Sequence, residues 1–508
     1  MEQYPYSEPD TTALESVWAG QGAYASRYRG VYIVWLVLAG LISFGIYVGF
    51  AGANWERATK VAAGFGLFLC IVHLWYVTRS KPINYLSPDL VFLAAYAMFH
   101  FGYLGLWVLG IVPAQNDILC YPDLYPKTVF IVNLGIIGFL FGYELFTSRG
   151  TGEVTRVVKV PTAAWTMVGL ALMLFSLAIF AVYVMRVGVE TFVSEGARPV
   201  ARMEWYIANP RLWRLRSNIF AIGFGVYITS VSLRYGKLFS GKLGITLFAT
   251  YIVLTILTGA RTPVVITGIV ILLVRHYLIK PIKLGPLIAI VVVFTFIFVA
   301  MGIVRDKVAF NIFKMSEELK YASQAKEIRW YEPFVETGKS VSTINLTTSL
   351  VPGTEPYWHG RSYIQSIVHI VPFLEGALVS KLGVGPAMWL TYIVKGPDAA
   401  GTGFSIVGEG YLNFGLVGAF LQMVFLGFLM RRIYLRFASS LSGSAALVFF
   451  VSFGIFASSV RNHLNVVLAP LVQIIVLALL LKMLCGEVQV SGDEPEQPLA
   501  NLELWAAY

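Results

Sequence analysis

Long apolar segments alternate with short polar segments along most of the 508-residue chain. About twelve of the apolar segments are long enough to span a bilayer as helices. Their ranges are 31–52, 58–77, 88–112, 127–147, 162–188, 218–236, 242–259, 262–279, 283–303, 405–430, 443–460 and 464–484. The 242–279 region also fits a tight helical hairpin that breaks between Gly259 and Pro263. The pattern therefore predicts an all-α polytopic membrane protein.

The polar segments divide the chain into regions. We expect an N-terminal tail over 1–30, a first bundle of about nine spans over 31–303, a large loop over 304–404, further spans over 405–484 and a tail over 485–508. The tail over 485–508 is acidic and contains proline, which predicts a flexible segment.

The large loop of about a hundred residues is too long for an ordinary connection. Two apolar stripes at helical spacing lie in it, and they predict helices that lie on the membrane surface. The stripes are Val308, Ile312, Met315 and Leu319, and Tyr363, Ile367, Ile370 and Leu374.

Composition agrees with a membrane protein, because 57% of the residues are hydrophobic and only 13% are charged. The net charge of +10 does not indicate nucleic-acid binding, since no basic run is interleaved with aromatics. Most basic residues of the short loops fall on one side of the predicted membrane, and the positive-inside rule then places both termini in the cytoplasm. They are Arg27, Arg29, Arg79, Lys81, Arg149, Arg156, Lys159, Arg234, Lys237, Lys242, Arg275, Lys280, Lys283, Arg431, Arg432, Arg436 and Lys482.

The stretch Gly401–Gly418 is the strongest candidate for a functional site. Glu409 lies about one turn inside the apolar run that it opens, where an ionisable side chain is expensive and usually functional. Asn413 follows four residues later and shares its helical face. Two more polar clusters, Gly259–Pro263 and Arg461–His463, fall at similar depth. We expect all three to meet in one cleft.

Arginines gather on the outer side, where the orientation rule disfavours them on short loops. The predicted outer loop over 189–216 is rich in arginine and ends at Arg216, and Arg261 lies between two apolar segments with no acidic residue nearby. Arginine binds phosphate oxygens in a bidentate manner, so the cluster indicates an anionic ligand such as a lipid pyrophosphate. The alternative is that individual arginines contact lipid headgroups or loop carboxylates.

Glu409 is also the best candidate for a general base. The alternative is a structural ion pair with Arg261, Arg305 or Arg461. His463, His359 and His369 are further candidates for proton transfer. For His359 the alternative is a capped loop histidine, and for His369, inside a predicted loop helix, a packing role.

Aromatic residues flank His359 in the segment Tyr357-Trp358-His359-Gly360-Arg361, and they are suited to stacking on a sugar. His73 and His100 lie within predicted spans, which favours a role in packing. No DxD, HExxH, Walker or GxSxG motif is present, and the three cysteines form neither a disulfide framework nor a zinc spacing. These absences argue against a metal-dependent glycosyltransferase, a zinc protease, an ATPase and an α/β-hydrolase.

The order of these motifs resembles the O-antigen polymerase family, the Wzy-type polymerases of oligosaccharide repeat units. The resemblance rests on three segments within 250–430: Leu257-Thr-Gly-Ala-Arg261, then Tyr357-Trp-His-Gly-Arg-Ser-Tyr363 with Ile370-Val-Pro372, then Gly403-Phe-Ser-Ile-Val-Gly-Glu409 continuing to Gly418. The first half of the chain matches the family in hydropathy alone.

The resemblance implies a multi-pass protein of the bacterial inner membrane with the GT-C-type helical architecture of O-antigen ligases. The large loop and the active site would face the periplasm, and the enzyme would be a metal-independent glycosyltransferase without a cofactor. It would move a growing glycan from an undecaprenyl pyrophosphate carrier onto another carrier-linked repeat unit, for O-antigen, capsule or exopolysaccharide. A chain-length regulator protein is a candidate partner.

Carried onto this chain, the resemblance implies roles for single residues. Glu409 would deprotonate the acceptor hydroxyl, with His359 and His463 as further catalytic candidates. The pyrophosphate would be held by Arg261, Arg305 and Arg361. From their places in the sequence we add Arg461 as a pyrophosphate contact, and we expect Tyr411, Asn413, Arg216 and Trp358 to bind the acceptor. No metal ligand is expected.

Three other functions remain open from the sequence. A ligase-like transferase of lipid-linked sugars would share the same architecture. A flippase or other secondary transporter would show two related halves and charges near the midplane. Here the charges gather at the outer mouth, and the large loop interrupts any symmetry. The third alternative is a non-catalytic assembly partner.

Overall fold

The computed structural model describes residues 11–490 except 51, 53, 80–83, 116–117, 119, 146–157, 189–209, 258–260, 294–330, 371–381, 397–402 and 441. Within this range, the side chains of 11–27, 158, 187, 210–218, 256–257, 261–262 and 490 are not described.

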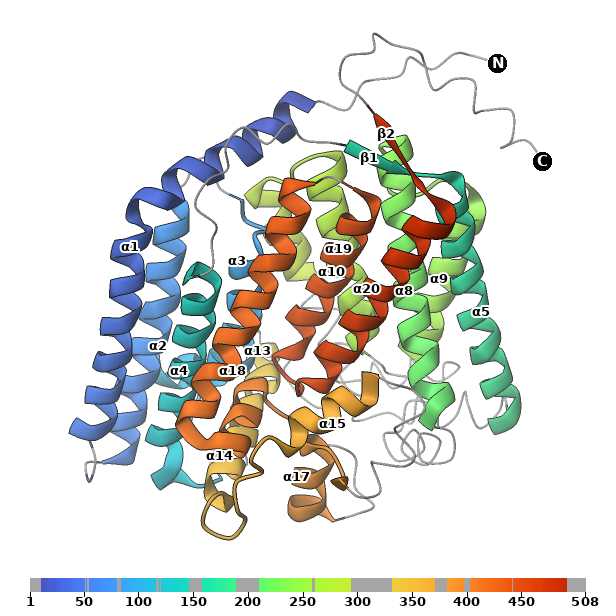
Figure 1. The fold of residues 1–508 in the computed structure, drawn as a ribbon. Coiled ribbons are helices and arrows are strands. Elements are labelled where there is room, and N and C mark those ends of the chain that lie inside the picture. Colours follow the sequence, from blue (N-terminus) through green and yellow to red (C-terminus); the bar gives the residue numbers. More distant parts are fainter. Residues whose placement is uncertain are drawn as a thin grey trace.

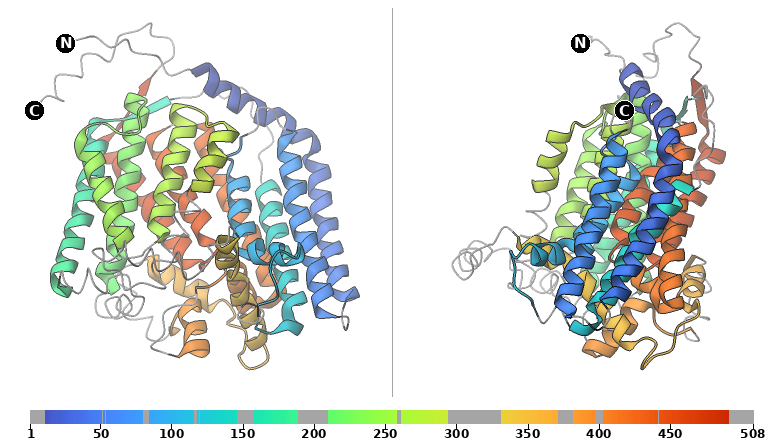
Figure 2. Two further views of the ribbon diagram at one scale, coloured as in Figure 1. Left: turned by 180° about the vertical axis from the view of Figure 1, so that it is seen from behind. Right: turned by 90° about the vertical axis from the view of Figure 1, so that its left-hand side faces the viewer.

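One half of the fold is built from α1 (Thr11–Gly49), α2 (Trp55–Thr78), α3 (Pro88–Val108) and α4 (Tyr125–Leu145), with a 3₁₀ turn over Pro122–Leu124 before α4. These helices lie side by side along one edge of the molecule (Figure 1). The side view in Figure 2 shows their axes running in nearly the same direction. Asn54 begins α2, because its side chain accepts hydrogen bonds from the backbone N–H groups of Glu56 and Arg57.

The other half contains α5 (Ala163–Val187), α8 (Pro210–Tyr235), α9 (Lys242–Leu257) and α10 (Arg261–Val274), which continues as a π-helical turn over Arg275–Ile279. Three C-terminal helices complete the bundle: α18 (Ile406–Ser439), α19 (Gly443–Ser459) and α20 (Asn465–Cys485). In Figure 1 they lie between the two halves. The predicted break between 242–259 and 262–279 matches the boundary between α9 and α10.

Seven helices of the described chain are long and apolar enough to cross a membrane. They coincide with the predicted segments beginning at 31, 58, 88, 127, 162, 405 and 464. Shorter apolar helices occupy Ile219–Tyr235, Lys242–Thr255, Pro263–Ile279, Leu284–Val293 and Gly443–Ser459. The chain is thus a mostly helical, polytopic membrane protein, while the number of about twelve spans stays a prediction.

Glycines set the central contact between α4 and α18. A methyl group at Gly142 would lie 2.0 Å from the Val424 carbonyl oxygen, and one at Gly427 would lie 2.1 Å from the Phe139 carbonyl oxygen. Because neither glycine has a side chain, the two backbones approach directly, as small residues allow in membrane bundles. This contact fixes α18, which carries the candidate site.

Four short helices pack against the lower part of the bundle in Figure 1 and belong to the predicted large loop. They are α13 (Glu332–Gly338), α14 (Ser340–Leu350), α15 (Arg361–Ile370) and α17 (Pro386–Lys395). The second predicted stripe begins on α15, where Ile367 is exposed and Tyr363 half-buried. The first stripe, from Val308 to Leu319, lies outside the described residues. Contact of these helices with a membrane surface stays a prediction.

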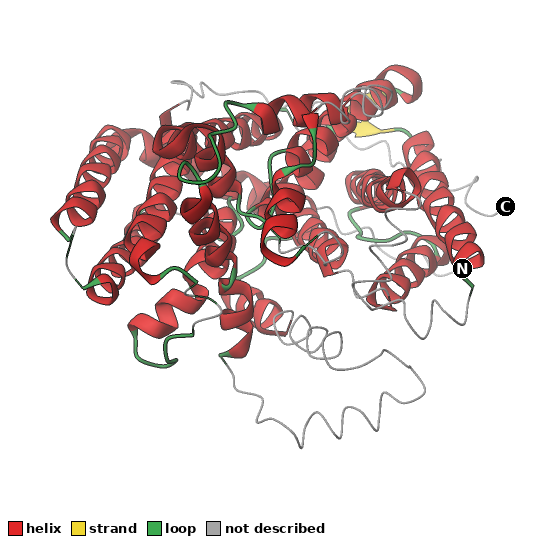
Figure 3. Cartoon of the chain, turned by 90° about the horizontal axis from the view of Figure 1, so that it is seen from below, coloured by secondary structure: helices red, strands yellow, loops and turns green. Residues whose placement is uncertain are grey.

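The opposite end of the molecule carries two strands that the sequence pattern missed. β1 (Val158–Pro161) pairs antiparallel with β2 (Glu487–Val490), with Val160 opposite Val488. Figure 3 shows how small this strand content is beside the helices. The expected flexible tail over 485–508 therefore begins with an ordered strand, because β1 supplies its backbone hydrogen-bond partners. The tail expected over 1–30 likewise contains the beginning of α1.

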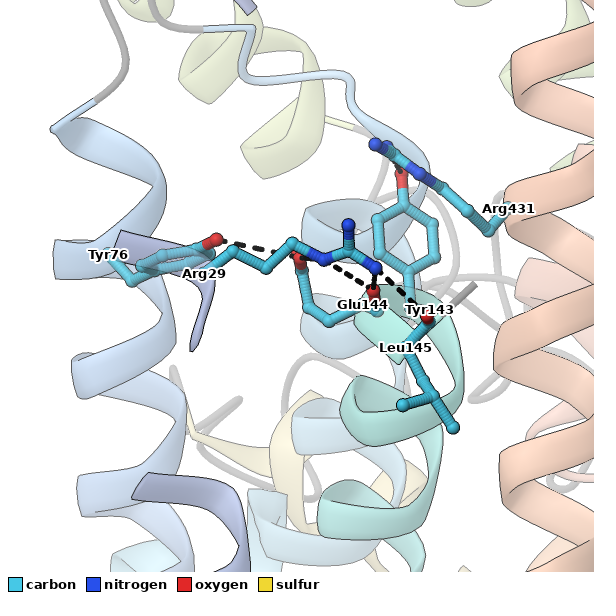
Figure 4. A network of polar contacts seen from close by, with 6 residues as sticks. All are labelled: Arg29, Tyr76, Tyr143, Glu144, Leu145 and Arg431. Atoms are coloured by element: carbon cyan, nitrogen blue, oxygen red, sulfur yellow. Dashed lines mark hydrogen bonds and ion pairs between the residues drawn. The ribbon is translucent and has the colours of Figure 1, made fainter. Parts of the chain in front are cut away.

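A mostly buried polar network ties several helices together (Figure 4). Arg29 donates through Nε to the carbonyl oxygen of Glu144 at 2.8 Å, and its Nε lies 3.9 Å from a Glu144 carboxylate oxygen. Arg431 of α18 donates to the Tyr143 hydroxyl at 3.3 Å. Beside this group, His73 and Asp89 form a buried pair at 2.9 Å. The network joins α1, α2, α3, α4 and α18.

Candidate functional site

The segment around Glu409 is a helical hairpin, whereas the sequence pattern predicted the start of one continuous span. The helical backbone of α18 breaks at Phe414 and Gly415, and Gly415 has a φ of 64° and a ψ of −147°. This conformation is close to exclusive to glycine, so Gly415 lets the chain turn sharply. We call 406–413 the short arm and 416–439 the long arm.

Two glycines let the arms pack against each other. A methyl group at Gly410 would lie 2.6 Å from the Gly418 carbonyl oxygen, and one at Gly418 would lie 2.2 Å from the Gly410 carbonyl oxygen. Residues eight positions apart would be well separated in a continuous helix. The backbone contact therefore shows that the chain folds back, and it brings the short arm beside the first turns of the long arm.

Glu409 of the short arm is fully buried. Its Oε2 atom accepts hydrogen bonds from the backbone N–H of Leu464 at 2.6 Å and from Gln422 Nε2 at 3.2 Å. Its Oε1 atom makes no hydrogen bond within the described part of the chain, although the Ser362 hydroxyl lies nearby. One carboxylate oxygen is thus held by two donors, and the other retains its capacity to accept a proton.

Glu409 forms no ion pair with any side chain that the structure describes. Among the partners considered from the sequence, the Arg461 side chain is described and makes no ion pair with it. The side chain of Arg261 and the whole of Arg305 lie outside the described residues, so those two alternatives stay open.

Gln422 lies thirteen positions after Glu409, yet the reversal brings it beside the short arm. Its Nε2 atom donates to the Ile406 carbonyl at 3.0 Å as well as to Glu409, and its Oε1 atom accepts from the Tyr363 hydroxyl at 2.7 Å. Burial and the nearby Glu409 carboxylate raise the pKa of Tyr363, so its hydroxyl keeps its proton and donates. Gln422 thus links α15 to the carboxylate.

Asn413 attaches the segment 358–363 to the hairpin. Its Oδ1 atom accepts from the backbone N–H of Gly360 at 3.0 Å, and its Nδ2 atom donates to the Ser362 hydroxyl at 2.7 Å and to the Glu409 carbonyl at 2.9 Å. The carboxamide predicted to bind an acceptor is therefore occupied by internal hydrogen bonds. It contributes to the site by positioning this loop.

The backbone continues the same attachment. Trp358 N–H donates to the Leu412 carbonyl at 3.0 Å, and His359 N–H donates to the Asn413 carbonyl at 3.1 Å. His359 has a φ of 48°, which is unusual for a residue other than glycine. Its exposed ring lies beside Tyr357 and Phe414, with centroid separations of 6.5 and 6.4 Å.

Arg361 begins α15 and is held by two contacts. Its Nε donates to the Leu382 carbonyl, and its guanidinium lies 4.6 Å from the centre of the Trp358 ring. Gly383 has a φ of 70°, and a methyl group there would lie 2.1 Å from one terminal nitrogen, so a larger residue would strain the backbone and displace the guanidinium. Trp358 itself is mostly buried and packs against Trp389 at 5.4 Å between ring centres.

The turn between α19 and α20 brings Arg461 and His463 to the hairpin. Phe404 N–H donates to the Arg461 carbonyl at 3.5 Å, and a methyl group at Gly403 would lie 3.4 Å from Arg461 Nε. His463 directly precedes Leu464, whose N–H binds Glu409. Two of the three predicted polar clusters therefore lie together.

Tyr411 and His100, two further residues singled out in the sequence, are both buried. Tyr411 is buried, donates its hydroxyl to the Val351 carbonyl at 3.1 Å and has the Lys127 amine 5.1 Å from its ring centre. His100 is buried and bonds Ser405 Oγ through Nε2 at 2.8 Å, in agreement with a packing role. The side chains of Arg216 and Arg261, and all of Arg305, lie outside the described residues.

The sequence interpretation missed Gln422, Ser362 and Tyr363. Gln422 carried a usable signal, because it is the single polar residue between Phe414 and Met430. A buried amide in an apolar run needs partners. Ser362 and Tyr363 lie in a segment that carries the family resemblance, but nothing in the sequence placed them beside Glu409, since their position follows from how α15 docks.

The fold and site define a polytopic membrane protein with a buried carboxylate at the end of the bundle where the loop helices pack. Within the described residues, no group of three histidine, cysteine, aspartate or glutamate side chains could hold a metal ion. Residues 31–486 match the family described as O-antigen polysaccharide polymerase Wzy, and the chain belongs to that family. This confirms the resemblance seen in the sequence.

One curated relative matches part of the chain. The chain is 27% identical to Protein CapE of Staphylococcus aureus over 211 residues. The match covers 39% of this chain and 43% of that protein, so the chain spans less than half the length of this relative. No solved structure matches the chain significantly.

Proposed function

We propose that this protein polymerises oligosaccharide repeat units linked to undecaprenyl pyrophosphate, with Glu409 as the general base. The family supports a polymerase of O-antigen or capsule repeat units in the membrane. The observation that carries the assignment of the base is the Glu409 carboxylate, which is buried, unpaired with any described cation and held through one oxygen.

The proposed reaction is a direct transfer. Oε1 of Glu409 accepts the proton of an acceptor sugar hydroxyl while that oxygen attacks the anomeric carbon of the donor glycan. The bond between this carbon and the pyrophosphate oxygen breaks, and undecaprenyl pyrophosphate leaves. A new glycosidic bond forms, and the carrier on the acceptor now holds the longer chain.

Arginines would offset the charge that develops on the leaving group. Arg361 is the described candidate closest in sequence to the hairpin contacts, because it lies between Gly360 and Ser362, which both bind Asn413. Arg461, a second described candidate, lies in the turn between α19 and α20, just before Leu464. Arg261 and Arg305 remain proposed contributors from the sequence, as do His359 and His463 for proton transfer.

We further propose that the hairpin and loop helices face the periplasm. Support comes from the arrangement in Figure 1, where α14, α15 and α17 lie opposite β1 and β2, and from the basic short loops that the sequence places on the cytoplasmic side. A cysteine at the exposed loop position Gly353, in a variant without native cysteines, should react with a membrane-impermeant reagent in intact cells. Labelling only after lysis would contradict this orientation.

The decisive test is polymerisation by the purified protein in nanodiscs. Undecaprenyl-pyrophosphate-linked repeat units from its host should yield a ladder of glycans with release of the carrier. Glu409→Gln should abolish the ladder, while Glu355→Gln, a carboxamide substitution in the loop between α14 and α15, should retain it. A ladder from Glu409→Gln would refute the base assignment. Absence of a ladder from the wild-type protein would instead favour a ligase or a transporter.

A further inference from the structure

We infer that Gln422 is a positioning residue that makes the orientation of the Glu409 carboxylate depend on the docking of α15 through Tyr363. This inference rests on the proposed function, because it concerns the base of that reaction. It assigns a role to Gln422, which lies on the apolar long arm and outside the three segments that carry the family resemblance.

The amide of Gln422 is fixed in one orientation by its partners. Both N–H groups of Nε2 are directed at acceptors, the Ile406 carbonyl at 3.0 Å and Glu409 Oε2 at 3.2 Å. Oε1 faces the donor hydroxyl of Tyr363 at 2.7 Å. A flipped amide would place its oxygen against two acceptors, so this assignment is the one that satisfies all three contacts.

The bond from Tyr363 therefore has a consequence for Glu409. Without that hydroxyl, nothing described holds Gln422 Oε1, and the amide is less constrained to present its N–H to the carboxylate. Glu409 Oε2 would then rely on the Leu464 N–H alone. Rotation of the carboxylate would move Oε1 away from the acceptor, and catalytic groups displaced by about 1 Å can lose a hundredfold in rate.

Substrate binding would act on the hydrogen bond between Tyr363 and Gln422 through α15. Tyr363 lies on α15, two residues after Arg361, a proposed pyrophosphate contact, and it is half-buried against Phe414 at 6.1 Å between ring centres. A substrate that fixes α15 in place would therefore also fix the Tyr363 hydroxyl beside Gln422 Oε1. Gln422 carries this change across the hairpin, from the long arm to the short arm.

The inference is tested with four variants in the nanodisc assay. Gln422→Met keeps the length of the side chain and removes the amide, and it should lower kcat roughly 10- to 100-fold with little change in KM for the acceptor repeat unit. Tyr363→Phe should lower kcat less. The double variant should match Gln422→Met alone, because both substitutions break the same relay. Gln473→Met on α20, whose side chain makes no described hydrogen bond, should behave as wild type.

A fifth variant, Gln422→Glu, provides a signature that a purely structural role would not give. In Gln422→Glu, the introduced carboxyl can donate to Glu409 Oε2 only when protonated, and two adjacent carboxyls share one proton. Its kcat should therefore recover relative to Gln422→Met as pH falls. Tyr363 on α15 also faces this position, and His463 directly precedes Leu464, whose N–H binds Glu409.

Wild-type kcat in Gln422→Met, additive losses in the double variant, or Gln422→Glu and Gln422→Met with the same pH profile would overturn the inference. If Gln422→Met is not monodisperse after extraction, the comparison of Tyr363→Phe with wild type decides, and equal kcat would overturn it. Failure of the proposed function has a different appearance, namely no ladder from wild type or a ladder from Glu409→Gln.

Discussion

Gly418→Ala tests whether the hairpin geometry matters for activity. The added methyl group would lie 2.2 Å from the Gly410 carbonyl oxygen and 2.8 Å from Phe414 Cβ. Carbon and oxygen in close contact stay about 3.3–3.6 Å apart, so the arms would have to separate by roughly 1 Å. Neither neighbour is the end of a flexible side chain, so the strain falls on the backbone.

This displacement sets the expected losses of stability and of catalytic rate. Overpacking of this kind costs about 1–3 kcal/mol of stability. A shift of about 1 Å in the short arm also moves Glu409 relative to Gln422 and Leu464, and such a shift is worth up to about a hundredfold in rate. We therefore expect Gly418→Ala to lower both the melting temperature and the yield of glycan ladder per folded protein.

Gly408→Ala is the matched control on the same short arm. A methyl group there would lie 3.5 Å from its nearest neighbours, Ile344 Cγ1 and Ser405 Cβ, which is ordinary contact. Alanine also stabilises a helix by up to about 1 kcal/mol over glycine. Gly408→Ala should therefore polymerise like wild type. Equal activity and stability of the two variants would refute the proposed backbone contact between the arms.

Three further predictions concern other parts of the molecule. Arg361→Lys should lower kcat/KM by roughly tenfold or more, since lysine lacks the planar fork of arginine and its stacking on Trp358; wild-type kinetics would show that only charge, or nothing, matters there. Asp89→Asn should lower the free energy of unfolding by about 1–3 kcal/mol, because it removes the charge from the buried hydrogen bond with His73, whereas Glu56→Gln, in the exposed pair with Lys60, should cost about 0.5 kcal/mol or less; equal melting temperatures would contradict this. EDTA should leave the glycan ladder unchanged, as a mechanism with arginines at the leaving group requires, and loss of the ladder restored by a divalent cation would contradict it.

Hydropathy predicted where the helices lie because apolar length is the main requirement for crossing a bilayer. The segment 127–147 became α4 over Tyr125–Leu145, and 464–484 became α20 over Asn465–Cys485. The two strands could not be predicted, since each is four residues long and depends on a partner more than three hundred positions away.

The candidate site was predictable to a smaller extent. Glu409 stood out because a carboxylate in an apolar run is costly, and the structure does bury it. The reversal at Phe414–Gly415 was hidden, because both residues are as apolar as a continuous span would require. Without the reversal, Gln422 lies more than three turns from Glu409, so their contact could not be inferred from helical spacing.

The bond from the Leu464 N–H to Glu409 has a consequence for biogenesis. Synthesis proceeds from the N-terminus, so the carboxylate enters the membrane region fifty-five residues before its strongest described donor is made. Until α19 is inserted and the following turn is in place, the short arm holds a carboxylate that the bilayer core disfavours. Insertion of the short arm into the membrane region therefore depends on one of the last steps of assembly. A nascent chain arrested before residue 464 should retain the short arm at the water interface.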